Sequence, residues 1–167
     1  MTDEDDDERG RSSQPGIESW HCFSSGPYYD PARIAWGPVI GLDEHLVAPG
    51  AGFDWHAHRG VYIASWVLNG ALWHEDSGGG SSLVTPGELF VQSTGSGIRH
   101  REWNASDEPL RFVQITIMAE AEPDTWSTSL PTEIAGVTVD VVADEVHSDA
   151  RRLALPLVDG HVLVLRI

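Results

Sequence analysis

The chain has 167 residues, of which 41% are hydrophobic and 22% charged, so it can form one domain with a buried core. Its 26 acidic side chains outnumber ten basic ones, all arginine, and the formal net charge is −16. This balance argues against direct nucleic-acid or membrane binding, since both partners attract concentrated positive charge. The single cysteine, an acidic N-terminus unlike an export signal and apolar runs too short to span a bilayer together predict a cytoplasmic protein.

The N-terminal segment is acidic and then rich in Gly, Ser and Pro, which predicts a disordered tail over residues 1–19. After it, short apolar or alternating runs are separated by turn residues, without a helical period. Asn69-Gly70, which follows one of these runs, is typical of a β-hairpin. The runs predict strands at 61–68, 71–74, 82–84, 89–91, 111–117, 137–142, 153–158 and 162–167. Many short strands of this kind indicate an all-β sandwich or barrel.

Two pairs of metal-binding residue types have the spacing of a β-strand. His56 and His58 are two residues apart, and so are His100 and Glu102, so each pair projects from one face of its strand. Three imidazoles and a carboxylate suit a divalent first-row metal. A single His-x-His pair is often only surface or core polarity, but two such pairs in an all-β chain favour a metal site. The isolated His74 is more simply a hydrogen-bonded interior residue than a ligand.

The segments around these pairs resemble a known family. Gly50 followed after five residues by His56-x-His58 is similar to the first cupin motif, and His100 followed after three residues by Asn104 is similar to the end of the second. More specifically, five segments resemble the N-terminal domain of pirins, in the same order along the chain. They are His21-Cys22-Phe23-Ser24 with Gly26–Pro31, Val47–Phe53, His56–Gly60, His74-x-Asp76-Ser77 and Gly95–Glu102.

The resemblance implies a fold and a metal site. Pirins are cupin β-barrels (the double-stranded β-helix or jelly roll), and residues 20–118 are the expected barrel here. Such barrels hold one metal, usually iron, and carried over residue by residue the ligands are His56, His58, His100 and Glu102. Fe(II) is therefore the expected ion, with Mn, Co, Ni, Cu or Zn as alternatives. Pirins carry a glutamate where this chain has Tyr62, which is expected to point into the barrel as a catalytic residue beside Glu102.

Some pirins oxidise flavonols such as quercetin. The resemblance therefore implies a metal-dependent dioxygenase that acts on a flavonol-like or other enol-bearing small molecule, with dioxygen as the second substrate. The alternative is a non-enzymatic, iron-dependent regulatory or protein-binding module, which the tyrosine at position 62 favours because a phenol is a poor base near neutral pH. A purely structural metal site, or a role as a partner in a biosynthetic complex, is a third reading.

Pirins generally carry two cupin domains, whereas residues 119–167 read as a linker and short strands that pack on the barrel or on a partner subunit. The final segment, 162–167, is an apolar strand with no charged extension to protect its edge. Because an exposed apolar edge invites pairing with another chain, a homodimer through residues 153–167 is expected.

Overall fold

The computed structural model describes residues 9–119, 126–129, 133–134, 137–142, 152–156 and 162–166. Every regular element in these ranges is a β-strand, and every strand pair is antiparallel, which confirms the all-β prediction. Within the same ranges there is no helix with the length and apolar character needed to cross a membrane. The chain divides into two compact units, residues 1–129 and 130–167.

The first unit contains two sheets. The larger has seven strands in the order β1-β2-β3-β10-β5-β8-β11, and the smaller has four in the order β4-β9-β6-β7. The strands of the larger sheet are β1 Gly10–Gln14, β2 Ile17–His21, β3 Val39–Val47, β5 Val61–Asn69, β8 Leu89–Ser93, β10 Leu110–Met118 and β11 Trp126–Ser129. Those of the smaller sheet are β4 Gly52–His58, β6 Leu72–Asp76, β7 Ser81–Val84 and β9 Ile98–Asn104.

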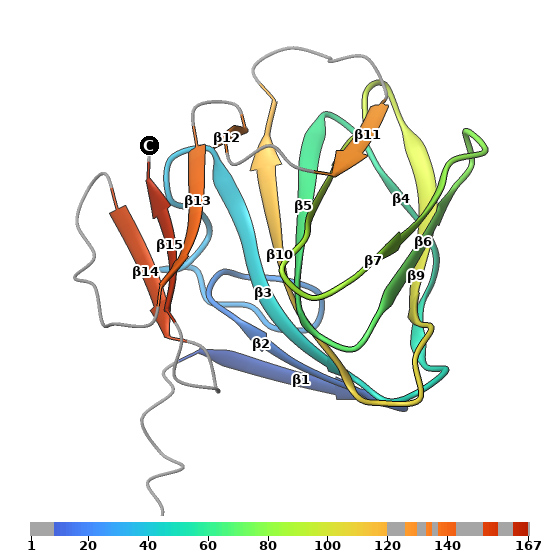
Figure 1. The fold of residues 1–167 in the computed structure, drawn as a ribbon. Helices are drawn as coiled ribbons and strands as arrows, with labels where there is room; N and C mark the ends of the chain where they lie inside the picture. The colour runs from blue at the N-terminus through green and yellow to red at the C-terminus, as the bar shows by residue number, and fades with distance from the viewer. Residues whose placement is uncertain are drawn as a thin grey trace, which may run out of the picture. The chain divides into compact units, whose positions relative to one another are not determined.

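The two sheets face one another, with the smaller sheet across from β5 and β10 (Figure 1). An apolar cluster from both sheets fills one part of the space between them: Ile17, Val47, Val67, Leu72, Val84, Phe90, Leu110 and Phe112. The predicted barrel differs from the structure in one respect, because the two sheets are not closed into one continuous hydrogen-bonded ring. They form a sandwich that the apolar cluster holds together.

Asn69-Gly70 marks the place where the chain passes from one sheet to the other. The predicted hairpin there is wrong, because β5 pairs with β8 and β10 whereas β6 pairs with β7 and β9. Gly70 has a φ of 80°, and a Cβ at this position would lie 2.7 Å from Leu110 Cα. The predicted turn is therefore present, but it leads the chain from one sheet of the sandwich to the other instead of joining two paired strands.

Residues 10–19 differ from the predicted disordered tail. Gly10–Gln14 pairs with Ile17–His21 as an antiparallel hairpin, and β2 continues onto β3. Arg9 adds a buried ion pair, with 2.8 Å between its Nη1 and Glu44 Oε2. Because β1 consists of a glycine and four polar residues, its sequence has no apolar alternation that would have predicted a strand. Residues 1–8 lie outside the described residues.

The second unit contains a four-stranded sheet in the order β12-β13-β15-β14. Its strands are β12 Glu133–Ile134, β13 Val137–Val142, β14 Arg152–Pro156 and β15 Val162–Arg166, so strands are present within the segments predicted at 137–142, 153–158 and 162–167. β14 and β15 pair antiparallel. β15 pairs with strands of its own chain on both sides. The unprotected edge expected at residues 162–167 is therefore not found among the described strands, and the homodimer stays a prediction.

Candidate metal centre

Three of the four predicted ligands meet between neighbouring strands of the smaller sheet. His56 and His58 come from β4 and His100 from β9, where His56 and His100 are directly opposed. Their ring centroids lie 4.4–4.9 Å apart. One donor nitrogen from each ring can be chosen so that all three lie within 4.8 Å of one another. A register shift between Phe53 and His56 precedes the cluster, and bulges of this kind re-aim side chains near functional sites.

The spacing of the facing nitrogens fits two ligands of one ion. His56 Nε2 lies 2.8 Å from His100 Nε2. Two imidazoles at right angles around an ion, each about 2.0–2.1 Å from it, would have nitrogens about 2.9 Å apart. The other nitrogen of His56, Nδ1, lies 2.7 Å from the carbonyl oxygen of Asp54, and this acceptor keeps the proton on Nδ1. Nε2 of His56 therefore carries no proton, and its lone pair is available to bind a metal ion.

Two further observations agree with a metal site. His58 Nε2 is buried and has no hydrogen-bond partner among the described residues. Burial lowers the pKa of His100 to about 4, with help from the neighbouring His56 and His58 imidazoles and against the Glu102 carboxylate. The pKa of His58 is lowered as well, first by burial and then by His56. Neutral imidazoles are the form that binds metals, so a lowered pKa keeps His58 and His100 in the form that can bind an ion at neutral pH.

Glu102 is buried on β9, two residues after His100. Burial alone would raise the pKa of its carboxyl group, but the imidazoles of His74 and His100 and the amide of Gln114 bring it below the usual range. Gln114 Nε2 donates to both carboxylate oxygens, at 3.2 and 3.0 Å, and the Ser65 hydroxyl approaches Oε1 at 3.5 Å. Glu102 is therefore a carboxylate held in place, suited to ligation rather than to accepting a proton.

His74, expected to be an interior residue, lies close to the predicted ligands. Together with His100 and Glu102 it forms a second group whose donor atoms lie within 4.8 Å of one another, and all three residues are buried. Glu102 belongs to this second group rather than to the group of three histidines, and His100 is shared by both. The sequence predicted an interior position for His74, and the residue is buried. It did not predict that His74 lies beside Glu102, because that contact depends on the pairing of β6 with β9.

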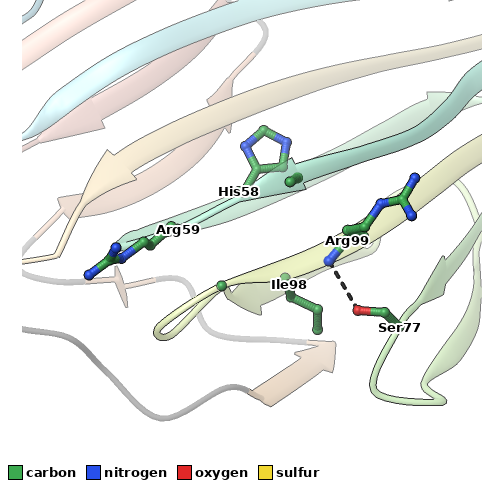
Figure 2. Close-up of a pocket in the computed structure, with 7 residues that line it drawn as sticks. His58, Arg59, Ser77, Ile98 and Arg99 are labelled. Carbon is green, nitrogen blue, oxygen red and sulfur yellow. Dashed lines mark hydrogen bonds between the residues drawn. The ribbon is translucent and has the colours of Figure 1, made fainter.

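A cavity of about 400 Å³ adjoins the cluster, at the end of the β4–β9 pair. Its lining includes His58 together with Ala57, Arg59, Ser77, Gly97, Ile98 and Arg99. Figure 2 shows Arg59 and Arg99 on either side of His58 and Ile98. The Arg99 backbone N–H donates to the Ser77 hydroxyl at 3.1 Å, which ties the β6–β7 loop to β9.

The expected place of Tyr62 differs from the structure. On β5, Tyr62 is three residues from Ser65, and no register shift separates them in either ladder. Alternation therefore puts the two side chains on opposite faces of the sheet. Because Ser65 is the residue that faces Glu102, Tyr62 lies on the outer face with Ala64 and Trp66. The catalytic role expected for it from the alignment loses its geometric basis.

Two other histidines of the larger sheet have their own partners. His21 Nδ1 lies 2.7 Å from Asp43 Oδ1, and its Nε2 lies 2.7 Å from Ser12 Oγ. His45 lies between the Phe53 and Phe112 rings, and its Nδ1 is 2.8 Å from Ser19 Oγ. Neither belongs to the metal-binding groups found among the described residues.

Comparison with known proteins agrees with this geometry. The family model described as Pirin matches residues 4–117. The chain belongs to the pirin family. A pirin-like protein of Caulobacter vibrioides is 32% identical over 166 residues, which cover 92% of this chain and 72% of that protein. A quercetin 2,3-dioxygenase of Escherichia coli is 39% identical over 114 residues, covering 68% of this chain. That region is 49% of the enzyme, so the chain spans about half the length of this curated relative.

Among solved structures, a bacterial pirin from Escherichia coli in complex with nickel(II) is similar, with a TM-score of 0.72 and 31% identity. The similarity covers 89% of this chain and 69% of that one. The cupin fold expected of a pirin is therefore confirmed, as an open pair of sheets.

Proposed function

We propose that this pirin holds one divalent transition-metal ion on His56, His58, His100 and Glu102, and that it oxidises a flavonol-like or other enol-bearing small molecule with dioxygen. The observation that carries the proposal is the convergence of three imidazoles beside a buried carboxylate. The resemblance to pirins makes Fe(II) the first ion to test, and a related pirin bound to nickel(II) makes Ni(II) the second.

Each of these side chains has a definable task. His58 and His100, whose pKa values are lowered by burial, present unprotonated nitrogens, and Glu102 adds one negative charge that offsets part of the charge of a divalent ion. When bound, the metal would supply Lewis-acid and redox chemistry toward an enolic substrate and dioxygen. Gln114 and Ser65 orient Glu102, and the Asp54 carbonyl orients His56. These contacts keep the donors arranged before any ligand arrives.

The cavity beside His58 gives a small molecule a place to bind. Its volume of about 400 Å³ is within the range of roughly 300–1,000 Å³ usual for ligand sites. The substrate class is proposed from the relatives named quercetin 2,3-dioxygenase, one of which is 39% identical to this chain. Since that enzyme is about twice as long as the matched region, its activity is a hypothesis for this chain.

The test is metal binding and oxygen uptake on the same samples. Metal-free protein is loaded separately with Fe(II), Ni(II), Mn(II), Co(II), Cu(II) or Zn(II), and the bound metal is counted. Oxygen consumption is then followed with quercetin and with a flavone that lacks the enolic hydroxyl. We expect one ion per chain and oxygen uptake only with the enolic compound.

The control separates the cluster from other histidines. His56→Ala/His58→Ala should abolish stoichiometric binding and oxygen uptake, whereas His45→Gln, outside the cluster, should keep both. Stoichiometric binding without oxygen uptake for any metal and enol would favour the regulatory alternative. Failure of the wild-type protein to bind one ion would refute the metal centre.

A further inference from the structure

We propose that His74 is a positioning residue for Glu102: it donates its Nδ1–H to the carboxylate and so aims Glu102 at the three-histidine cluster. The inference rests on the proposed metal centre, which it extends by two residues, His74 and Gln92. His74 is on β6 directly opposite Glu102 on β9, and both side chains are almost completely buried.

Asp76, at the end of β6, is held by the turn that follows it. Its Oδ1 accepts the backbone N–H groups of Gly78 and Gly80, at 2.8 and 3.1 Å, so the β6–β7 turn fixes the carboxylate. Its Oδ2 lies 3.2 Å from Nε2 of Gln92. Because this carboxylate can only accept, the atom of Gln92 that faces it must be the amide nitrogen. Asp76 therefore sets the orientation of the Gln92 amide.

The same Gln92 nitrogen faces His74. It lies 3.2 Å from His74 Nε2, so its second proton is directed at the imidazole. The same Nε2 lies 3.8 Å from Asp76 Oδ2, which is too long for a hydrogen bond, so the Gln92 amide is its hydrogen-bond partner. Since an amide nitrogen only donates, Nε2 of His74 accepts and carries no proton. The neutral imidazole then has its proton on Nδ1. The position of this proton is thus determined by hydrogen bonds that start at the β6–β7 turn.

Nδ1 of His74 is directed at the metal site. It lies 3.7 Å from Glu102 Oε1, and it is a buried nitrogen with no hydrogen-bond partner among the described residues. A contact of this length is too long for a hydrogen bond, but contacts in ligand-free sites often shorten when the ligand binds. Glu102 is the acceptor that would satisfy Nδ1 once the contact shortens. With Gln114 on the other side of the carboxylate, the two donors fix its plane.

The first test reads the proton directly. In metal-free protein labelled with ¹⁵N-histidine, two-bond ¹H–¹⁵N correlation spectra distinguish the two imidazole tautomers, and His74→Leu assigns the resonances. We expect His74 to be protonated at Nδ1 and bare at Nε2. A proton on Nε2 would overturn the proposal, and so would a Zn(II)-loaded spectrum in which a His74 nitrogen carries the metal.

The second test reads the consequence for Glu102. His74→Leu removes the donor, and His74→Asn keeps an amide donor at the place of Nδ1. Loss of an outer partner of a metal ligand typically costs about 10–100-fold in metal affinity. We expect such a loss of Ni(II) affinity in His74→Leu and a change of less than about threefold in His74→Asn, because the asparagine keeps a donor at this position.

Gln92→Leu removes the amide that hydrogen-bonds to His74. It should lower the Ni(II) affinity less than His74→Leu does. Wild-type affinity in a folded His74→Leu protein, checked by circular dichroism, would refute the positioning role. If His74→Leu does not fold, the tautomer of the wild-type protein still decides. Failure of the wild-type protein to bind Ni(II), Fe(II) or Zn(II) refutes the proposed function instead, and the metal-free spectra tell the two failures apart.

Discussion

The space between the two sheets has an apolar end and a polar end, and the same strands build both. On β5, β6 and β10 the inward positions change character within one step of two residues: Val67 to Ser65, Leu72 to His74 and Phe112 to Gln114. Phe90 and Gln92 on β8 repeat the pattern. One register therefore positions a hydrophobic cluster and, about 7 Å further along each strand, the side chains around Glu102.

The apolar end and the polar end contribute differently to the free energy of folding. The apolar end buries hydrocarbon, which stabilises the fold. At the polar end four buried atoms have no hydrogen-bond partner among the described residues, namely His58 Nε2, His74 Nδ1, His100 Nδ1 and Gln92 Oε1. Unpaired buried polar groups cost stability. We therefore infer a division of roles, in which the apolar end stabilises the fold and the polar end binds a ligand.

The largest expected effect is at the apolar end. Phe112 is fully buried and contacts the rings of Phe53 and His45. Phe112→Ala should lower the free energy of unfolding by about 3–5 kcal/mol, because it removes buried surface and leaves a cavity. Urea denaturation of metal-free protein measures the loss. Leu83→Ala, at a side chain that is 50% exposed, is the matched control and should change stability by less than about 0.5 kcal/mol.

The next effect belongs to the polar end. A metal at 100 times its dissociation constant should raise the free energy of unfolding by about 2.7 kcal/mol, since it binds only the folded chain. Thermal and urea unfolding with and without Ni(II) measure the gain, which should vanish in His56→Ala/His58→Ala. An equal gain in that double variant would show that the ion binds elsewhere. The polar end would then not be the binding site.

The sequence predicted the candidate ligands, three of which meet in the structure, but it did not predict the residues around Glu102. The spacing of His56, His58, His100 and Glu102 could be read because strand alternation is local. The neighbours of Glu102 could not, because Gln114, Ser65 and His74 come from three other strands whose register depends on the whole sandwich. Two expectations differ from the structure for the same reason. The inward position of Tyr62 was expected from the resemblance to pirins, and not from the strand register. Asn69-Gly70 was expected to form a hairpin, but the tertiary fold makes it the connection between two sheets.

A smaller effect should appear at His45, an imidazole that adjoins the apolar end. Burial is the main reason that its pKa is lowered. In the unfolded chain a histidine takes up a proton below about pH 6.5, while His45 in the folded protein resists it. Its contribution to stability is therefore complete above pH 6.5 and lost as the pH falls toward the folded pKa.

Between pH 7.5 and 5.5 the loss from this one group should not exceed about 1.4 kcal/mol, the value for a histidine that stays unprotonated in the folded protein over this range. His45→Phe should remove that part of the pH dependence, as measured by urea unfolding of metal-free protein at the two pH values. The control is His21→Phe, at the other buried histidine of the larger sheet, where His21 is paired with Asp43. An unchanged pH dependence in His45→Phe would show that the His45 imidazole does not resist protonation in the folded protein.

An effect of similar size is expected at Ser12, where the polar end continues onto β1 and β2. Ser12, His21 and Asp43 are linked by two contacts of 2.7 Å, in the order of a nucleophile, a base and an orienting acid. A working nucleophile also needs a cavity for its substrate and donors for an oxyanion. Here the Tyr28 ring stacks on His21 at a centroid distance of 5.9 Å, and the cavity beside His58 has none of these residues in its lining.

The geometry of this set therefore points to packing rather than to acyl transfer. Ser12→Ala should lower the free energy of unfolding by about 0.5–1.5 kcal/mol, the usual worth of one hydrogen bond, and should leave metal affinity unchanged. The wild-type protein should not react with a fluorophosphonate, which labels activated serines. Labelling that disappears in both Ser12→Ala and His21→Ala would give the polar end a second chemistry. The polar end would then contain two reactive sites, the metal centre and the serine.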